Sequence, residues 1–148
     1  AAGCSVETMM RPFSTRTMRR ELKPLELAFL GDAVYGLYIR HYLLLKGVVR
    51  PFQLQRQSVR FVAAKAQARV LKHLMPLLSE AEKDVVRRGR NAKPRSVPKN
   101  TDVLTYKQSS AFEALIGHLY LENNDRRLEQ LINESILFIE NNQDGQVT

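Results

Sequence analysis

Between residues 25 and 45 the apolar side chains recur at steps of three and four, which is the period of an α-helix. The pattern is carried by Leu27, Leu30, Val34, Leu37 and Tyr38. Pro24 suits the first turn, where its missing N–H costs nothing, and Gly47 can end the helix. Because this segment is apolar nearly all round as far as Ile39, we expect the helix to be central and buried.

Further helices are predicted over residues 51–75, 80–90, 105–122 and 126–140. The first of these can break near Ser58. Ser79 and Glu82 form a capping-box signature for the second, and Asp125 is a candidate N-cap for the last. Residues 91–104 hold two prolines and no periodicity, which predicts a loop. No segment shows the alternation of a strand, so the expected fold is an all-α domain of about five to seven helices.

The chain of 148 residues, 44% hydrophobic, fits one globular domain. We expect that domain over residues 21–141, followed by a flexible tail over 142–148. Residues 1–20 are basic and lack apolar periodicity, so a flexible arm, an expression-tag remnant and a transit-peptide fragment all remain open. No apolar run reaches the roughly 18 residues of a membrane span. The single cysteine, Cys4, excludes an intramolecular disulfide framework, and a reducing cytoplasm is the expected compartment.

The net charge of +8 is unevenly distributed along the chain. Residues 46–107 hold 15 Lys/Arg and 4 acids, whereas residues 108–148 hold 2 Lys/Arg and 7 acids. A basic middle beside an acidic end predicts a face that binds a polyanion. The alternative is a solvated surface that is simply basic. Membrane-surface binding fits less well, since the basic residues are spread over several segments, including a loop.

Asp32 is an acidic residue within the most apolar predicted helix. A buried carboxylate costs several kcal/mol unless a group pairs with it or it binds a ligand. Gly31 beside it costs the helix roughly 1 kcal/mol relative to Ala. Two unfavourable residues side by side indicate a functional site or close packing. A core aspartate paired with an arginine or a helix end is an equally weighted alternative.

Glu113 repeats this pattern, because it is a single acid in an apolar helix with Gly117 four residues later. If the two helices pack together, Asp32 and Glu113 meet at one point. Paired carboxylates with water-filled positions suit Mg²⁺. A Mg²⁺ ion between carboxylates and a phosphate can activate water and stabilise the leaving oxygen. The alternative is two unrelated acids, each paired with a base.

The end of the third predicted helix and the loop after it are rich in cations and amides. The candidate residues there for binding a nucleic-acid backbone are Arg87, Arg88, Arg90, Asn91, Lys93, Lys99 and Asn100. This composition is typical of phosphate contacts. The loop has no aromatic residue for stacking single-stranded bases, so the backbone of a duplex fits better. Arg60 and Lys65, on the preceding helical stretch, are weaker candidates.

Together these segments resemble the ribonuclease III family. Residues 27–34 (LAFLGDAV) resemble its signature helix, and residues 113–117 (EALIG) resemble its second catalytic helix. Residues 88–93 (RGRNAK) followed by 98–103 (PKNTDV) are similar to its compact branch, Mini-ribonuclease III. The resemblance covers residues 25–131, and the ordered set of motifs is specific. We expect no room after it for the double-stranded-RNA-binding domain of the larger enzymes.

The resemblance implies an α-helical, homodimeric endonuclease that cuts double-stranded RNA with Mg²⁺ and leaves 5′-phosphate and 3′-hydroxyl ends. It also implies 23S ribosomal RNA precursor as the substrate. Asp32 and Glu113 match two metal-binding catalytic carboxylates, and we expect Asp32 to orient the attacking water as well. Ser110, one turn before Glu113, is a candidate to contact the metal through water. Phe29 matches an aromatic residue of the family's dimer interface.

Three positions depart from the larger enzymes of the family. Those enzymes carry acids at the positions of Leu25, Ala28 and Ser110. Fewer carboxylates make a less negative site that binds Mg²⁺ more weakly, with water in the empty positions. Glu26 lies six residues before Asp32, off that helical face, whereas Asp102 is a candidate to reach the site from its loop.

The smaller number of carboxylates, compared with the larger enzymes, motivates a second hypothesis. In it the chain is a non-catalytic RNA-binding dimer that acts as a ribosome-assembly factor. A third hypothesis treats the basic face as a contact for an acidic protein. A steep loss of RNA affinity with salt would count against the third.

Overall fold

The computed structural model describes residues 21–94 and 96–142. In that part of the chain the elements are α2 (Pro24–Leu45), α3 (Pro51–Val62), α4 (Ala64–Leu74), the 3₁₀ helix η2 (Met75–Leu77), α5 (Glu80–Asn91), α6 (Val103–Leu121) and α7 (Asp125–Asn141). These six α-helices confirm the predicted all-α class. The predicted arm over 1–20, and the tail beyond residue 142, lie outside the described residues. Within the described residues, no helix has both the length and the apolar character that crossing a membrane requires.

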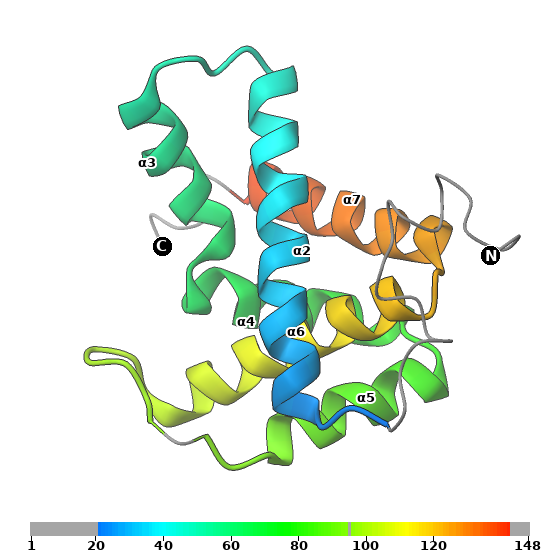
Figure 1. Cartoon of the computed structure of the whole chain (residues 1–148). Helices are drawn as coiled ribbons and strands as arrows, with labels where there is room; N and C mark the ends of the chain where they lie inside the picture. The colour runs from blue at the N-terminus through cyan, green and yellow to red at the C-terminus, as the bar shows by residue number, and fades with distance from the viewer. Residues whose placement is uncertain (1–20, 95, 143–148) are drawn as a thin grey trace, which may run out of the picture.

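Helix α6 lies at the centre of the domain. It packs against α2, α4 and α5, and α7 lies against α4 and α6. From Ser109 to Gly117 every residue of α6 is buried except Glu113. In Figure 1, α2 crosses α6 while α3 runs back beside the far half of α2. A helix so covered must be apolar on all sides, and the carboxylate of Glu113 is therefore the exception that needs an explanation.

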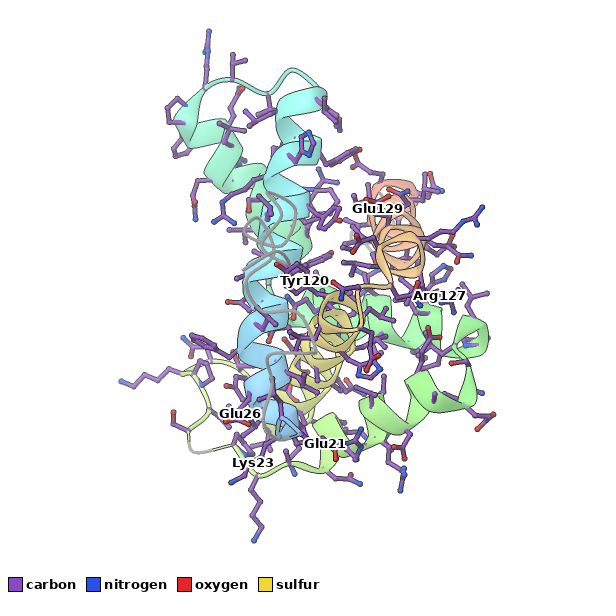
Figure 2. The ribbon with its side chains drawn as sticks, turned by 45° about the vertical axis from the view of Figure 1, so that its right-hand side comes forward. Glu21, Lys23, Glu26, Tyr120, Arg127 and Glu129 are labelled. Carbon is purple, nitrogen blue, oxygen red and sulfur yellow. The ribbon has the colours of Figure 1, made fainter. Side chains whose placement is uncertain are left out.

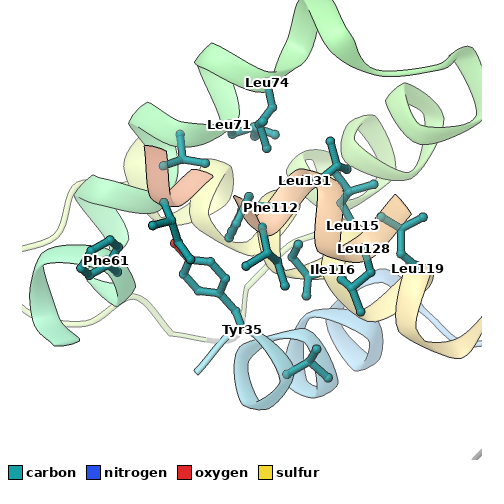
Figure 3. Close-up of a cluster of buried hydrophobic side chains, with 14 of the residues drawn as sticks. Tyr35, Phe61, Leu71, Leu74, Phe112, Leu115, Ile116, Leu119, Leu128 and Leu131 are labelled. Atoms are coloured by element: carbon teal, nitrogen blue, oxygen red, sulfur yellow. The ribbon is translucent and has the colours of Figure 1, made fainter. Parts of the chain in front are cut away.

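The hydrophobic core fills the space between α2, α4, α6 and α7 (Figure 3). Its largest fully buried side chains include Tyr35, Phe61, Phe112, Leu115, Ile116 and Leu131. The rings of Tyr35 and Phe112 meet edge to face with centroids 4.9 Å apart, an arrangement that aromatic quadrupoles favour. Burying each such side chain stabilises the fold by about 1.5–3 kcal/mol. This core fixes how α2 and α6 cross.

Helix α2 is central, as predicted, but it is not buried on all sides. Phe29 is 84% exposed and Leu37 is 67% exposed. Ala33, between them at a spacing of four, is exposed as well. These three residues form one stripe along the helix. The prediction of burial all round is wrong because the other helices pack against only part of the circumference of α2.

Two predicted boundaries also need correction. The chain breaks between α3 and α4 at Ala63, whose φ of −61° and ψ of 146° are extended, and not near Ser58. The N-cap of α7 is Asn124, whose side chain accepts a hydrogen bond from the backbone of Arg127 at 3.3 Å, and not Asp125. At the start of α7 a neighbouring residue with the same capping preference takes the role, whereas Ala63 is a good helix former and its local sequence does not explain the break.

Other local predictions are confirmed. Ser79 and Glu82 form the predicted capping box of α5. Pro24 occupies the first turn of α2. Gly47 follows α2 with a φ of 91°, a backbone conformation that glycine adopts without strain.

Candidate active site

The backbones of α2 and α6 touch where the two helices cross. A Cβ atom on Gly31 would collide with the backbone of Glu113 and lie 2.8 Å from the nitrogen of Gly117. A Cβ atom on Gly117 would in turn collide with the carbonyl of Leu27. Only glycine permits backbones to come this close. Close packing therefore explains both glycines.

This crossing brings together the two predicted catalytic carboxylates. Asp32 directly follows Gly31, and Glu113 lies one turn before Gly117. The Glu113 carboxyl lies within hydrogen-bonding reach of Asp32. Asp32 itself is exposed at the rim of the crossing, so the expectation that it is buried is wrong. The two acids lie close together, as the sequence predicts for two helices that pack against each other.

Glu113 has a strongly perturbed acidity. Burial, followed by the hydrogen bond and the charge of Asp32, raises its pKa to about 9, and a hydrogen bond from Gln67 opposes that rise only in part. Burial disfavours the charged form of a carboxyl, and a like charge nearby does the same. The pair therefore holds a proton near neutral pH unless a cation replaces it.

A third side chain, Gln67 of α4, completes this arrangement. Its Nε2 donates a hydrogen bond to Glu113 Oε2 at 3.4 Å, and Ser109 Oγ donates to Gln67 Oε1 at 2.6 Å. Gln67 is not among the site residues that the sequence predicts. It has one sequence signal, because it is the polar residue on an apolar helix face shared with Ala63 and Val70.

The two carboxylates open into a cleft of about 910 Å³. Its walls come from the first turns of α2, the start of α4, α6 and the loop between α5 and α6. Among the lining residues are Ala28, Phe29, Asp32, Ala64, Pro94, Ser96, Pro98, Ser110 and Glu113. Ser110, predicted to act at the metal through water, is buried in this wall one turn before Glu113.

Glu26 also lines the cleft, although it lies off the face of Asp32. It is the third residue of α2, and its Oε1 accepts a hydrogen bond from the backbone N–H of Lys23 at 2.8 Å. Figure 2 shows both residues at the start of α2, with Glu21 beside them. The carboxylate of Glu26 thus caps its helix.

Asp102 does not supply the missing carboxylate. It is the N-cap of α6, where it accepts hydrogen bonds from the Thr105 backbone at 2.8 Å and from Thr105 Oγ1 at 2.7 Å. Those hydrogen bonds lower the pKa of Asp102. Asp102 lies eleven positions before Glu113, a rise of roughly 16 Å along the helix axis. Across residues 21–94 and 96–142, no three acids, histidines or cysteines gather as a metal cluster.

The two carboxylates nevertheless fit a hard divalent cation. Such ions prefer carboxylate oxygens, and Mg²⁺ keeps several waters when it is bound by one or two carboxylates. The open cleft leaves space for those waters. A cation would also neutralise the negative charges of Asp32 and Glu113, whose mutual repulsion otherwise favours a proton on Glu113.

Comparison with known proteins identifies the family. A model of the Ribonuclease III domain matches residues 25–124. Proteins named Mini-ribonuclease 3 from Brevibacillus brevis and Symbiobacterium thermophilum are each 50% identical to the chain. The alignments cover 79% and 82% of the chain, and 87% and 94% of those relatives. The chain belongs to the Mini-ribonuclease III branch of the ribonuclease III family.

The fold agrees with this membership. An X-ray crystal structure of a Fusobacterium nucleatum protein matches with a TM-score of 0.72 and 35% identity. The match covers 79% of this chain and 93% of the solved one. The chain is therefore an endoribonuclease of double-stranded RNA, in a family that depends on divalent metal ions.

The seven residues of α5 and the loop after it that are predicted to bind RNA fall into two groups. The first group is exposed at the end of α5 and along the loop that follows it. Its members are Arg90, Asn91, Lys93, Lys99 and Asn100. The tip of the loop is a turn in which Asn100 has a φ of 68°, and Figure 1 shows it projecting from the body of the domain. We refer to these five residues as the loop cations and amides.

The second group, Arg87 and Arg88, forms ion pairs within the domain. Arg87 pairs with Asp84, and Arg88 pairs with Asp84 at 3.2 Å and with Glu21 at 3.4 Å. These are partly exposed ion pairs, which are worth little and can exchange partners.

Arg60 and Lys65 differ from each other in their surroundings. The Arg60 guanidinium lies 2.9 Å from Glu140 of α7 and stacks over the Phe61 ring. Burial opposes ionisation of Glu140, but hydrogen bonds from Lys46, Tyr42 and Arg60 outweigh it and lower its pKa to about 2. Arg60 thus ties α3 to α7, whereas Lys65 is exposed at the start of α4, beside the cleft.

Proposed function

We propose that this chain is a homodimeric, Mg²⁺-dependent endonuclease that matures the ends of 23S ribosomal RNA precursor in the cytoplasm. It leaves 5′-phosphate and 3′-hydroxyl ends. One observation carries the proposal, namely the Asp32–Glu113 pair at the mouth of a cleft of about 910 Å³ beside a basic loop. The ribosomal substrate and the end chemistry rest on the resemblance to the family.

In the proposed reaction the two carboxylates have different roles at the reacting phosphate. Asp32 and Glu113 would hold Mg²⁺, which when bound would supply the charge that activates water and stabilises the leaving oxygen. To hold the cation, Glu113 would have to lose its proton to solvent water, since only the ionised carboxylate is a good metal ligand. Asp32, exposed at the rim, orients the attacking water. Ser110 lines the same cleft and hydrogen-bonds a water at the site.

The loop cations and amides bind the phosphate backbone of the RNA. Lys93 and Lys99 are exposed and reach phosphate oxygens as point charges, while the amide of Asn100 donates a hydrogen bond. Proline residues of the same loop line the cleft, so a strand held by the loop runs past the carboxylates. Phosphate contacts of this kind position a duplex without reading its sequence.

The exposed stripe of α2 supports a homodimer. Phe29 protrudes from it, and a hollow of about 640 Å³ opens on the same stretch of helix. The hollow is lined by Leu30, Ala33, Val34, Leu37, Tyr38, His41, Tyr120 and Glu129. Figure 2 shows Tyr120 and Glu129 beside α2. In a two-fold dimer, Phe29 of each copy fills the hollow of the other.

Such a dimer also provides two sites for one duplex. Each copy carries one Asp32–Glu113 pair, so the two strands are cut by different subunits. The exposed Phe29 and Leu37 are otherwise unfavourable on the surface of a monomer.

The substrate proposal is tested with a transcript that carries the paired ends of 23S precursor and with an unrelated duplex of equal length. We expect faster cleavage of the precursor at defined positions, with ends that a 5′-phosphate-dependent exonuclease accepts. Equal rates on both duplexes would contradict the ribosomal assignment. Products that carry 5′-hydroxyl groups would contradict the end chemistry.

A further inference from the structure

We propose that Gln67 is a positioning residue of the active site. The chain of hydrogen bonds from Ser109 to Gln67 to Glu113 holds the Glu113 carboxylate in the orientation that receives the cation. This inference rests on the proposed function, in which Glu113 holds Mg²⁺. It assigns a role to a buried amide on α4, a helix that carries none of the predicted catalytic residues.

The direction of the amide follows from its two partners. An amide oxygen only accepts hydrogen bonds, and an amide nitrogen only donates them. Ser109 Oγ lies 2.6 Å from Gln67 Oε1, so Gln67 Nε2 faces Glu113 Oε2. The reverse orientation would set two acceptor oxygens against each other. The Glu113 carboxylate therefore fixes which end of Gln67 faces it, and the Ser109 hydroxyl, which can donate or accept, completes the chain by donating to the Gln67 oxygen.

The burial of Gln67 indicates that it serves the site more than the stability of the fold. Gln67 is 1% exposed and Ser109 is 6% exposed. A buried amide loses its hydrogen bonds to water and regains only those that the protein offers. The other buried residues of α4 are Ala68, Val70, Leu71 and Leu74. An apolar side chain of the same length would pack at this position without that cost.

An amide suits this task better than a charged residue would. Because Gln67 is neutral, it orients Glu113 without adding a like charge and without neutralising the carboxylate. A lysine or arginine here would compete with the cation, and an acid would repel Glu113. Partners that hold a metal ligand in place typically change metal affinity or activity about 10–100-fold when they are removed.

The test uses the full chain and the variant Gln67→Met, which has similar length but no hydrogen-bond donor. Mn²⁺ binding without RNA is measured by the loss of the free-ion electron paramagnetic resonance signal. We expect the Kd for Mn²⁺ to rise about tenfold. The rate of duplex cleavage at subsaturating Mg²⁺ falls by a similar factor, whereas the affinity for duplex RNA without metal stays unchanged.

Ser135→Ala is the matched control. Ser135 is a buried hydroxyl of α7 that donates to the Leu131 carbonyl at 2.7 Å, away from the cleft. Its loss removes one buried hydrogen bond and lowers the Tm, but Mn²⁺ affinity should remain at the wild-type value. An equal loss of Mn²⁺ affinity in Ser135→Ala and Gln67→Met would mean that Gln67 acts only through stability, which overturns the proposal.

Ser109→Ala is a second variant with a smaller structural change. It tests the positioning role of Gln67 even if Gln67→Met does not fold. It frees the Gln67 oxygen and should weaken Mn²⁺ binding less than Gln67→Met does. The double variant should be no worse than Gln67→Met alone, because residues in one chain of hydrogen bonds are not additive. Wild-type Mn²⁺ affinity in Ser109→Ala and in any folded Gln67→Met protein overturns the proposal.

Glu113→Gln separates this inference from the proposed function. If Glu113→Gln weakens Mn²⁺ binding and Gln67→Met does not, the positioning role alone is wrong. If Glu113→Gln binds Mn²⁺ as well as the wild type, the metal site itself is wrong and the positioning role is overturned with it.

Discussion

Gly31 and Gly117 face each other where α2 crosses α6, and a Cβ atom on Gly117 would lie 3.1 Å from the Gly31 nitrogen. This approach sets the distance between the helices that carry Asp32 and Glu113. Each glycine costs its helix roughly 1 kcal/mol relative to Ala. Only glycine permits the close backbone contact that brings the two carboxylates to one point.

Gly31→Ala should therefore destabilise the protein even though alanine is the better helix former. The added Cβ meets backbone atoms of Glu113, which cannot turn away as a side chain can. Overpacking of this kind should lower the free energy of unfolding by at least about 2 kcal/mol. Urea denaturation measures the effect.

Gly36→Ala is the control on the same helix. Its Cβ would approach only the guanidinium of Arg40, the movable end of a long side chain. We expect it to leave the stability unchanged or raise it by up to about 1 kcal/mol. If the two variants lose equal stability, the helix crossing does not depend on backbone contact at Gly31.

Phe29→Ala should convert the dimer to a monomer. It removes the large apolar side chain that fills the hollow on the partner copy in the proposed dimer, and interfaces depend on a few such anchors for several kcal/mol. Sedimentation velocity at micromolar concentration reports the mass. Phe52→Ala, a change at an aromatic residue 74% exposed on α3, should stay dimeric. A dimer in both variants would place the interface elsewhere.

The metal-free protein should lose stability as the pH rises from about 5 to about 9. The pKa of Glu113 is raised from 4.5 to about 9 in the fold. The folded state therefore binds the proton more tightly than the unfolded state, and its stability falls with pH between the two values. Thermal melts from pH 5 to 9 should show this slope in the wild type. They should show a flatter profile in Glu113→Gln.

The fall of Tm with pH should be smaller in the wild type when Mg²⁺ is present, because the cation takes the place of the proton on Glu113. A Tm that falls equally in wild type and Glu113→Gln would show that Glu113 does not titrate in this range.

Arg90→Ala and Lys99→Ala should weaken duplex RNA binding equally for all sequences. Each lost phosphate contact should also reduce the slope of log affinity against log salt by about 0.9. Fluorescence anisotropy at several salt concentrations measures both quantities. Arg126→Ala, an exposed cation at the start of α7, is the control. If Arg126→Ala has the same effect, binding depends on net charge and not on the loop.

Much of the fold, and the choice of Asp32 and Glu113 as the candidate catalytic pair, follows from local patterns. The three-and-four spacing in 25–45 predicts α2, and the Ser79–Glu82 pair predicts the start of α5. Asp32 and Glu113 are identifiable because a single acid beside or near a glycine is unfavourable in an apolar helix. Such conflicts between local propensity and position commonly mark functional sites.

The remainder depends on tertiary contacts. The exposed side of α2 cannot be inferred from its apolar sequence, because a surface that binds a second copy has the composition of a core. Gln67 looks like an ordinary polar residue until α4 and α6 are packed together. Arg60 looks like a free cation until α7 brings Glu140 to it. Sequence periodicity describes one helix at a time and does not specify its neighbours.

The most direct test is single-turnover cleavage of a duplex RNA and of the matching single strand, with and without Mg²⁺. The proteins compared are the wild type, Asp32→Asn, Glu113→Gln and the control Glu122→Gln, an exposed acid at the end of α6. We expect cleavage of the duplex alone, only with Mg²⁺, by the wild type and the control. Both site variants should bind the duplex and cut it at least about 100-fold more slowly. Cleavage that survives Asp32→Asn, or wild-type protein that binds the duplex without cutting it at any Mg²⁺ concentration, would contradict the assignment of the Asp32–Glu113 pair as the catalytic centre.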